Sequence, residues 1–164
     1  MSTKYENLNV ATRSDFNFLI DLLGLNTDEF YHYIGMDASR VTLIAKGQRD
    51  WSAGCLRLAY SMFEKVADDV TILKPMFRAM IEQDYYGFVD KVRNCNSPLV
   101  FKRIKGCASK TTIASLAKNP TVFNKGVVRH RRYFESLKES CDKYEKIMSD
   151  IKFYIEQQEE TYEK

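Results

Sequence analysis

The stretch from Leu25 to Gly47, LNTDEFYHYIGMDASRVTLIAKG, decides how the fold of this chain is interpreted. Its apolar residues recur at spacings of three and four, which is the period of an amphipathic helix. Asn26 or Thr27 can cap a first helix and Asp37 a second, because their side chains accept hydrogen bonds from unpaired backbone amides. Gly35 lies where the chain must reverse, and glycine adopts a left-handed backbone at little cost. The stretch therefore predicts two short helices joined by a tight turn.

Two more helices are predicted beside this pair. Ser14 or Asp15 can cap one that ends at Gly24, and Ser52 can begin another that reaches Asp68. The side chains expected to face inward are Phe16, Leu19, Ile20 and Leu23, then Phe30, Ile34, Met36, Val41 and Ile44, then Leu56, Ala59, Phe63 and Val66. Together the four helices predict a compact head over residues 10–70, within an all-α chain.

The spacing of these four helices resembles the Cro/phage-repressor-like helix–turn–helix family, often called XRE. The shared features are Leu25 before a polar N-cap, Glu29-Phe30, the turn Ile34-Gly35-Met36, Val41 and Ile44 in the second helix, and Lys46-Gly47 closing it. The resemblance covers about 55 residues, roughly a third of the 164-residue chain. It implies a lambda-repressor-like head and a sequence-specific, DNA-binding transcriptional regulator.

In that family the second helix of the pair enters the major groove. Carried over, the resemblance implies DNA contacts from Thr27, Ala38, Ser39, Arg40, Thr42, Leu43, Lys46, Gln48 and Arg49. Ser39 and Arg40 can bond to base edges, and Leu43 can meet a thymine methyl group. Thr27 would offer its hydroxyl and backbone amide to a phosphate, while the residues after Gly47 would flank the DNA backbone.

Two features favour an alternative from another class, a helical protein-interaction or scaffold module that keeps the helix–turn–helix core without DNA contacts. Tyr31 stands where the family usually carries Ala, so its ring must turn outward or push the helices apart. Residues 1–70 also carry ten acidic and seven basic side chains. Neutralising phosphates supplies much of the affinity for DNA, so a net acidic head weakens the DNA interpretation.

Residues 71–164 predict a second, helical region for oligomerisation or regulation. One helix is expected over Lys74–Asn94 with Pro75 in its first turn. Its stripe is Phe77, Met80, Ile81, Asp84/Tyr85, Phe88 and Val92. Residues 99–126 predict two or three short helices, broken at Gly106, Asn119-Pro120 and Gly126, with a strand as the lesser alternative.

Residues 127–163 carry the clearest long pattern, a heptad seam typical of a coiled coil. The seam is His130, Phe134, Leu137, Cys141, Tyr144, Met148, Ile151, Ile155, Gln158 and Tyr162. A helix this long needs another helix against it, either from the middle segment or from a second chain. We expect a homodimer through the C-terminal helices, which would place two heads on a palindromic DNA site.

The positive charge is concentrated in the middle of the chain. Residues 71–133 carry thirteen basic and three acidic side chains, although the whole chain has a net charge of only +3. The densest clusters are Lys102, Arg103, Lys105 and Lys110, then Arg129, Arg131 and Arg132. These cations either contact phosphates or pair with the acidic tail or head across a packing interface.

Other classes of function are disfavoured. The four cysteines are isolated from one another in the sequence, and neither histidine has a second metal ligand at helical spacing, which disfavours a metal site. The segment KGCASKTT lacks the glycine-rich loop that binds phosphates, which disfavours nucleotide binding. No pattern of catalytic residues occurs, so we expect no enzyme, metal or cofactor. No apolar run reaches the roughly 18–20 residues that cross a bilayer, and no secretory signal begins the sequence. These patterns predict a cytoplasmic protein.

Overall fold

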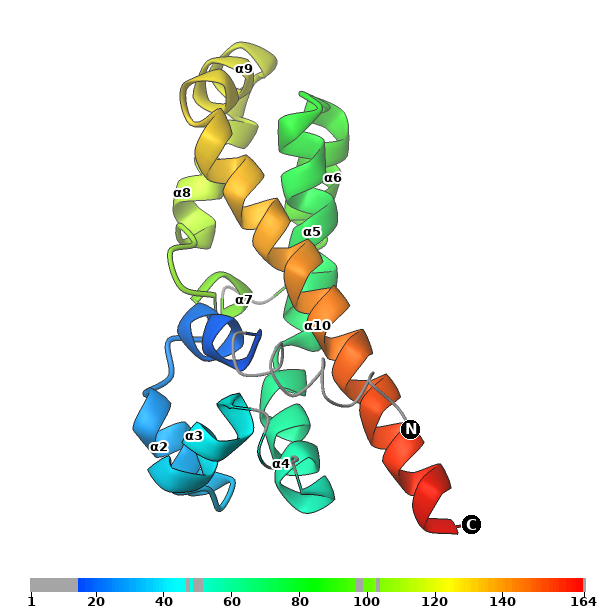
Figure 1. The fold of residues 1–164 in the computed structure, drawn as a ribbon. Coiled ribbons are helices and arrows are strands. Elements are labelled where there is room, and N and C mark those ends of the chain that lie inside the picture. The colour runs from blue at the N-terminus through cyan, green and yellow to red at the C-terminus, as the bar shows by residue number, and fades with distance from the viewer. Residues whose placement is uncertain (1–14, 47, 49–51, 97–98, 103, 164) are drawn as a thin grey trace. The chain divides into compact units, whose positions relative to one another are not determined.

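The computed structural model describes residues 15–46, 48, 52–96, 99–102 and 104–163 (Figure 1). Every regular element among these residues is helical, so the fold is all-α, as predicted. They form two compact units, one from the chain up to Lys65 together with the chain from Glu145 onward, the other from Val66–Tyr144. The sequence placed the whole tail with the second region, but the last residues group with the head. In the described residues no helix is both long and apolar enough to span a membrane.

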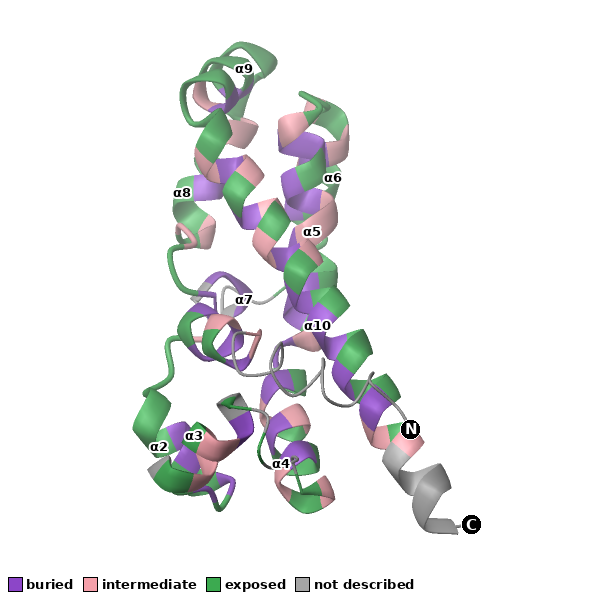
Figure 2. Ribbon diagram, viewed as in Figure 1, coloured by how far each residue is buried: buried purple, intermediate pink, exposed green. Residues whose placement is uncertain are grey.

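The first unit contains helical residues 15–22, α2 (Thr27–Tyr33), α3 (Ala38–Ala45), α4 (Ala53–Glu64) and the second part of α10 (Arg131–Glu163). Three phenylalanine rings from three helices form its core: Phe16, Phe30 and Phe63 have centroids 5.0–6.1 Å apart. Figure 2 shows buried and exposed residues alternating along these helices. The predicted inward residues of this unit are buried, except that Leu23 and Val41 are half-buried.

Local capping determines where these helices begin. Asn26, Asp37 and Ser52 each accept a hydrogen bond from the backbone amide three residues further on, at 3.0, 2.8 and 3.2 Å. Each such bond satisfies an amide that the helix itself leaves unpaired. These three predicted caps are therefore confirmed, with Asn26 as the cap of α2, whereas Ser14, predicted with Asp15 for the first helix, lies outside the described residues. The expected extension of α4 to Asp68 is wrong, because the chain leaves helical geometry at Val66.

The second unit contains α5 (Ala67–Ile81), α6 (Tyr85–Arg93), α7 (Leu99–Lys102), α8 (Lys110–Ala114), the 3₁₀ helix η1 (Ser115–Lys118), α9 (Pro120–Arg129) and the first part of α10. α5 packs against α6 and α7, and α6 packs against α9. The rings of Phe88 on α6 and Phe123 on α9 have centroids 4.9 Å apart. Lys74 on α5 forms an ion pair with Asp142 on α10, with a nitrogen–oxygen distance of 2.9 Å.

The prediction of a single helix over Lys74–Asn94 is wrong. α5 ends at Ile81, and the chain turns at Gln83, whose φ is 56°, before Asp84 caps α6. The apolar period continues across this turn, which is why periodicity alone did not find it. Pro75 lies inside α5 instead of in a first turn, because the helix begins eight residues earlier than Pro75, at Ala67. Proline lacks the amide that would pair with the carbonyl four residues before it.

The middle segment forms short helices, as predicted, and no strand occurs in its described residues. Gly106 interrupts them with a φ of 83°, and Asn119 caps α9 with Pro120 as its first residue. The predicted break at Gly126 is wrong, because this glycine lies inside α9. A Cβ atom at Gly126 would lie 2.5 Å from Cδ2 of Leu116. The glycine therefore allows η1 to approach α9 closely.

The tail forms one long helix, α10, which begins at Arg131. The predicted tail began at residue 127, but the residues up to Arg129 belong to α9. The buried seam residues are Phe134, Leu137, Cys141, Tyr144, Met148 and Ile151. Ile147 and Tyr154 are buried beside them, so the apolar stripe is wider than a two-position heptad seam. His130 is exposed, Ile155 is half-buried, and the side chains of the last two seam positions lie outside the described residues. Six of the eight described seam residues are thus buried within one chain.

Candidate nucleic-acid interface

A four-residue turn joins α2 and α3, and backbone hydrogen bonds define it. The amide of Met36 donates to the carbonyl of Tyr31 at 2.8 Å, and the amide of Gly35 donates to the carbonyl of His32 at 3.0 Å. This is the Schellman pattern, which requires a left-handed residue just after the helix. Gly35 has a φ of 83°, so it occupies that position as predicted.

The inner side of the pair packs against the phenylalanine core. Phe30, Ile34, Met36 and Ile44 are buried, with exposed fractions of 5% or less. Among the α3 side chains that the structure describes, Ile44 is the buried one, and Val41 is half-buried. α3 therefore rests on the core through Ile44, with Arg40, Val41 and Leu43 half-buried beside it, and leaves Ser39 and Thr42 exposed.

The described positions predicted to contact DNA differ in their exposure. Thr27, Ser39, Thr42, Lys46 and Gln48 are exposed, and Arg40 and Leu43 are half-buried. Ala38 begins α3, but its side chain and the whole of Arg49 lie outside the described residues. Five of the described positions thus lie on α2 or α3, and Lys46 and Gln48 follow the end of α3.

Arg40 is more enclosed than a solvated helix residue. Its Nε atom is buried and has no hydrogen-bond partner among the described residues. Arginine has five N–H donors, so the terminal nitrogens remain for a phosphate or a base edge. The backbone amide of Arg40 is used separately, because it donates to the capping carboxylate of Asp37 at 2.8 Å.

Negative charge surrounds the N-terminus of α2. Asp28 and Glu29 are both exposed in its first turn, directly after Thr27. Carboxylates there are favourable for the helix dipole, but they oppose a phosphate approaching Thr27. By contrast, α3 itself contains no acidic residue; the exposed Asp37 caps its start and the exposed Lys46 caps its end. The electrostatics therefore favour an anionic partner at α3 over one at the start of α2.

Tyr31 does not turn outward. It is 7% exposed, and its ring lies edge-on to Phe30 with centroids 5.4 Å apart. The phenol is accommodated within the first unit while the turn after α2 keeps its regular hydrogen bonds. The departure from the usual Ala is therefore absorbed by packing.

The cations of the basic middle segment have different environments. Lys110 donates to the carbonyl of Cys95, and Arg131 pairs with Glu135 one turn later in α10 at 3.3 Å. Arg129 and Arg132 are exposed and make no ion pair among the described residues. Arg103 and the side chain of Lys102 lie outside the described residues. Some of these cations thus serve the fold, while others remain accessible.

Sequence reasoning did not find a cavity of about 540 Å³ in the second unit. It lies between the α8–η1 segment and the corner where α9 meets α10, so three separate segments line it. Tyr133 forms part of the wall, and its hydroxyl donates to the carbonyl of Gly106 and accepts from the amide of Ala108, both at 2.7 Å. Burial raises the pKa of this phenol. The signal in the sequence was that Lys125 and Arg129 are one helical turn apart and so share a side of their helix. Periodicity cannot show, however, that a cavity lies between this helix and other segments.

The described residues include no group of three or more His, Cys, Asp or Glu side chains that could hold a metal ion. The four cysteines, all within the described residues, form no disulfide, and Cys95 and Cys141 are buried. Burial raises the pKa of the Cys107 thiol to about 11, which keeps it protonated near neutral pH.

The chain was compared with protein-family models, with curated proteins and with solved structures. None of the three comparisons found a match.

Proposed function

We propose that this chain is a sequence-specific DNA-binding transcriptional regulator, cytoplasmic, with α3 lying in the major groove of double-stranded DNA. The observation that supports this most is the uncovered side of α3, where Ser39, Thr42 and Lys46 are exposed. The exposed Ser39 lies in the first turn of this eight-residue helix, which Asp37 caps, and a groove-reading helix contacts base edges with its N-terminal residues.

The side chains offer both kinds of contact that DNA recognition needs. Ser39 and Thr42 can bond to base edges, and Leu43 can pack on a thymine methyl group. Lys46 and the terminal nitrogens of Arg40 supply charge for phosphates. Such a small set discriminates weakly, so two copies acting together are part of the proposal. Because most of the described seam of α10 is buried, a dimer contact on this helix would use its outer face, where Phe153 is 43% exposed.

The test is a salt titration of full-length protein binding to random duplex DNA. Each phosphate contact contributes about 0.9 to the slope of log affinity against log salt. Lys46→Gln and Arg40→Gln should each reduce that slope by roughly one contact. Lys65→Gln is the matched control, because Lys65 is an exposed lysine of the same unit that lies outside the α2–α3 pair. It should leave the slope unchanged.

Two outcomes would contradict this proposal. Absence of binding at about 50 mM salt would favour the protein-interaction module. A slope that falls for Arg132→Gln but not for Lys46→Gln would move the contacts to the basic middle segment.

A further inference from the structure

We propose that the cavity of the second unit binds a small amphipathic carboxylate, with the apolar part in the cavity and the carboxylate at its cationic rim. This site lies wholly within Val66–Tyr144, so it is independent of the proposed DNA contacts. Its volume of about 540 Å³ falls in the range of about 300–1,000 Å³ typical of small-molecule sites.

The walls of the cavity are mainly apolar. Ile113 and Phe134 line it, although their side chains are only 1% and 5% exposed, and Leu116 and Ala108 complete the apolar surface. The hydroxyl of Tyr133 already donates a hydrogen bond to the carbonyl of Gly106. An apolar group entering this space would therefore bury hydrocarbon without stranding the hydroxyl donor of Tyr133.

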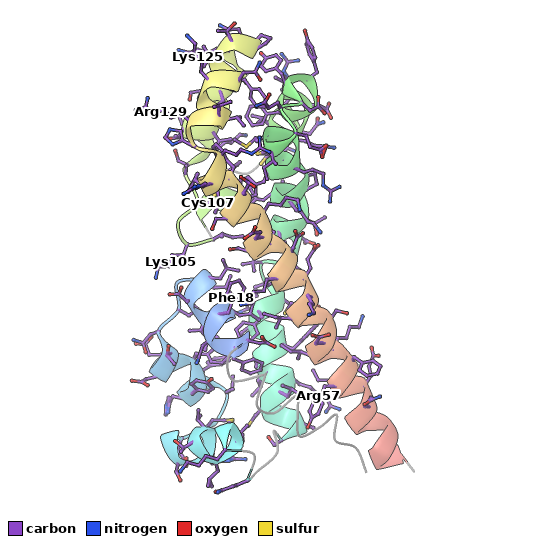
Figure 3. All side chains as sticks on the ribbon, turned by 45° about the horizontal axis from the view of Figure 1, so that its top comes forward. Phe18, Arg57, Lys105, Cys107, Lys125 and Arg129 are labelled. Carbon is purple, nitrogen blue, oxygen red and sulfur yellow. The ribbon has the colours of Figure 1, made fainter. Side chains whose placement is uncertain are left out.

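The rim carries positive charge and no negative charge. Lys125 and Arg129 lie one turn apart on α9, His130 follows, and the lining contains no Asp or Glu. Figure 3 shows Lys125 and Arg129 on the same side of α9. Their side chains form no ion pair or hydrogen bond within the described residues. A carboxylate bound here would meet two cations that have no acidic competitor in the lining.

Local structure holds the two sides of the site together. Tyr133 at the start of α10 bonds to both Gly106 and Ala108, which fixes the loop before α8. Gly126 lets Leu116 lie against α9, because any larger residue would place a Cβ atom 2.5 Å from it. The cavity is thus formed by residues with defined positions on both of its sides.

The test compares sodium octanoate with octan-1-ol, which has the same chain length and no charge. The full-length protein is labelled with ¹⁵N, and its amide signals are followed during titration. Octanoate should produce saturable shifts that centre on residues 108–116 and 125–134, and binding should weaken as salt rises. Octan-1-ol should bind several-fold more weakly.

Two variants and a matched control locate the site. Arg129→Gln should weaken octanoate binding by at least about threefold, and Ser115→Trp, at an exposed lining position, should block the cavity. Arg132→Gln removes the same charge three residues away and outside the lining, and it should bind as the parent does. The amide spectrum of each variant verifies that it folds.

Three results would overturn the proposal. Equal binding of octan-1-ol and octanoate would show that the rim does not select an anion. Equal weakening by Arg129→Gln and Arg132→Gln would show that only overall charge matters. Absence of saturable shifts at the cavity would show that the space takes no such ligand.

Discussion

Replacing Gln83 by glycine should stabilise this protein. The ends of α2 and α5 have the same hydrogen-bond pattern. The amide of Met36 donates to the carbonyl of Tyr31, and the amide of Asp84 donates to the carbonyl of Ala79, both at 2.8 Å. At α2 the left-handed position is Gly35, with a φ of 83°, whereas at α5 it is Gln83, with a φ of 56°. One chain thus contains the same turn with and without its preferred residue.

The magnitude follows from two opposing terms. A left-handed backbone costs a residue with a Cβ atom about 1–2 kcal/mol, which glycine avoids. Glycine loses more backbone entropy on folding, which offsets about 0.4–1 kcal/mol of that gain. Because Gln83 is exposed, removing its side chain sacrifices little packing. Gln83→Gly should therefore raise the free energy of unfolding by about 0.5–1 kcal/mol, equivalent to roughly 1–4 °C in Tm for a chain of this length.

The assay is urea unfolding of the full-length protein followed by circular dichroism, with the thermal midpoint as a second measure. Gln83→Ala is the matched control, because it removes the same side chain and keeps the Cβ atom; it should not stabilise. Gly35→Gln is the reciprocal change and should destabilise, since nothing within 4 Å of a Cβ atom there would compensate the strain. If Gln83→Gly leaves the midpoint unchanged while Gly35→Gln lowers it, the reasoning about the turn at Gln83 is refuted.

Two further predictions concern titrating groups. Hydrogen bonds from Lys138 and Lys74 lower the pKa of Asp142 below its ordinary 3.8, so its contribution to stability is present above that value and is lost as the pH falls through the lowered pKa. The difference in unfolding free energy between the parent and Asp142→Asn should be at most about 1 kcal/mol at pH 6 and should shrink in urea titrations toward pH 3; a constant difference would contradict it. For Cys107, raising the pKa of the thiol from 9.0 to about 11 lowers the thiolate fraction at pH 8 roughly a hundredfold. Mass spectrometry should show iodoacetamide alkylating it about a hundred times more slowly in the folded chain than in urea, and equal rates would argue against this burial.

Much of the local structure was predictable because it depends on residues within one helical turn of each other. Asn26, Asp37 and Asn119 cap helices through amides three residues ahead, and such bonds form whatever else the chain contacts. The uncovered side of α3 was predictable for the same reason, because helical periodicity alone separates Ile44 from Ser39.

Other features depended on contacts between distant segments. Tyr31 is buried rather than turned outward because the phenylalanine core has room for its ring, and the amino-acid pattern near Tyr31 does not describe that room. The turn at Gln83 was missed because no glycine marks it and the apolar period continues past it.

The amino-acid sequence by itself determined that the chain is helical, where α2, α3 and α4 begin, and that Ser39 and Thr42 lie on the polar side of α3. Only the tertiary structure decided that one chain covers the α10 seam, that Gly126 belongs inside a helix, and that Lys125 and Arg129 border a cavity. The physical reason is the separation along the chain between the residues that interact. Caps and periodicity act over three or four residues, whereas burial and cavities arise from the shapes of segments that meet only after the chain has folded.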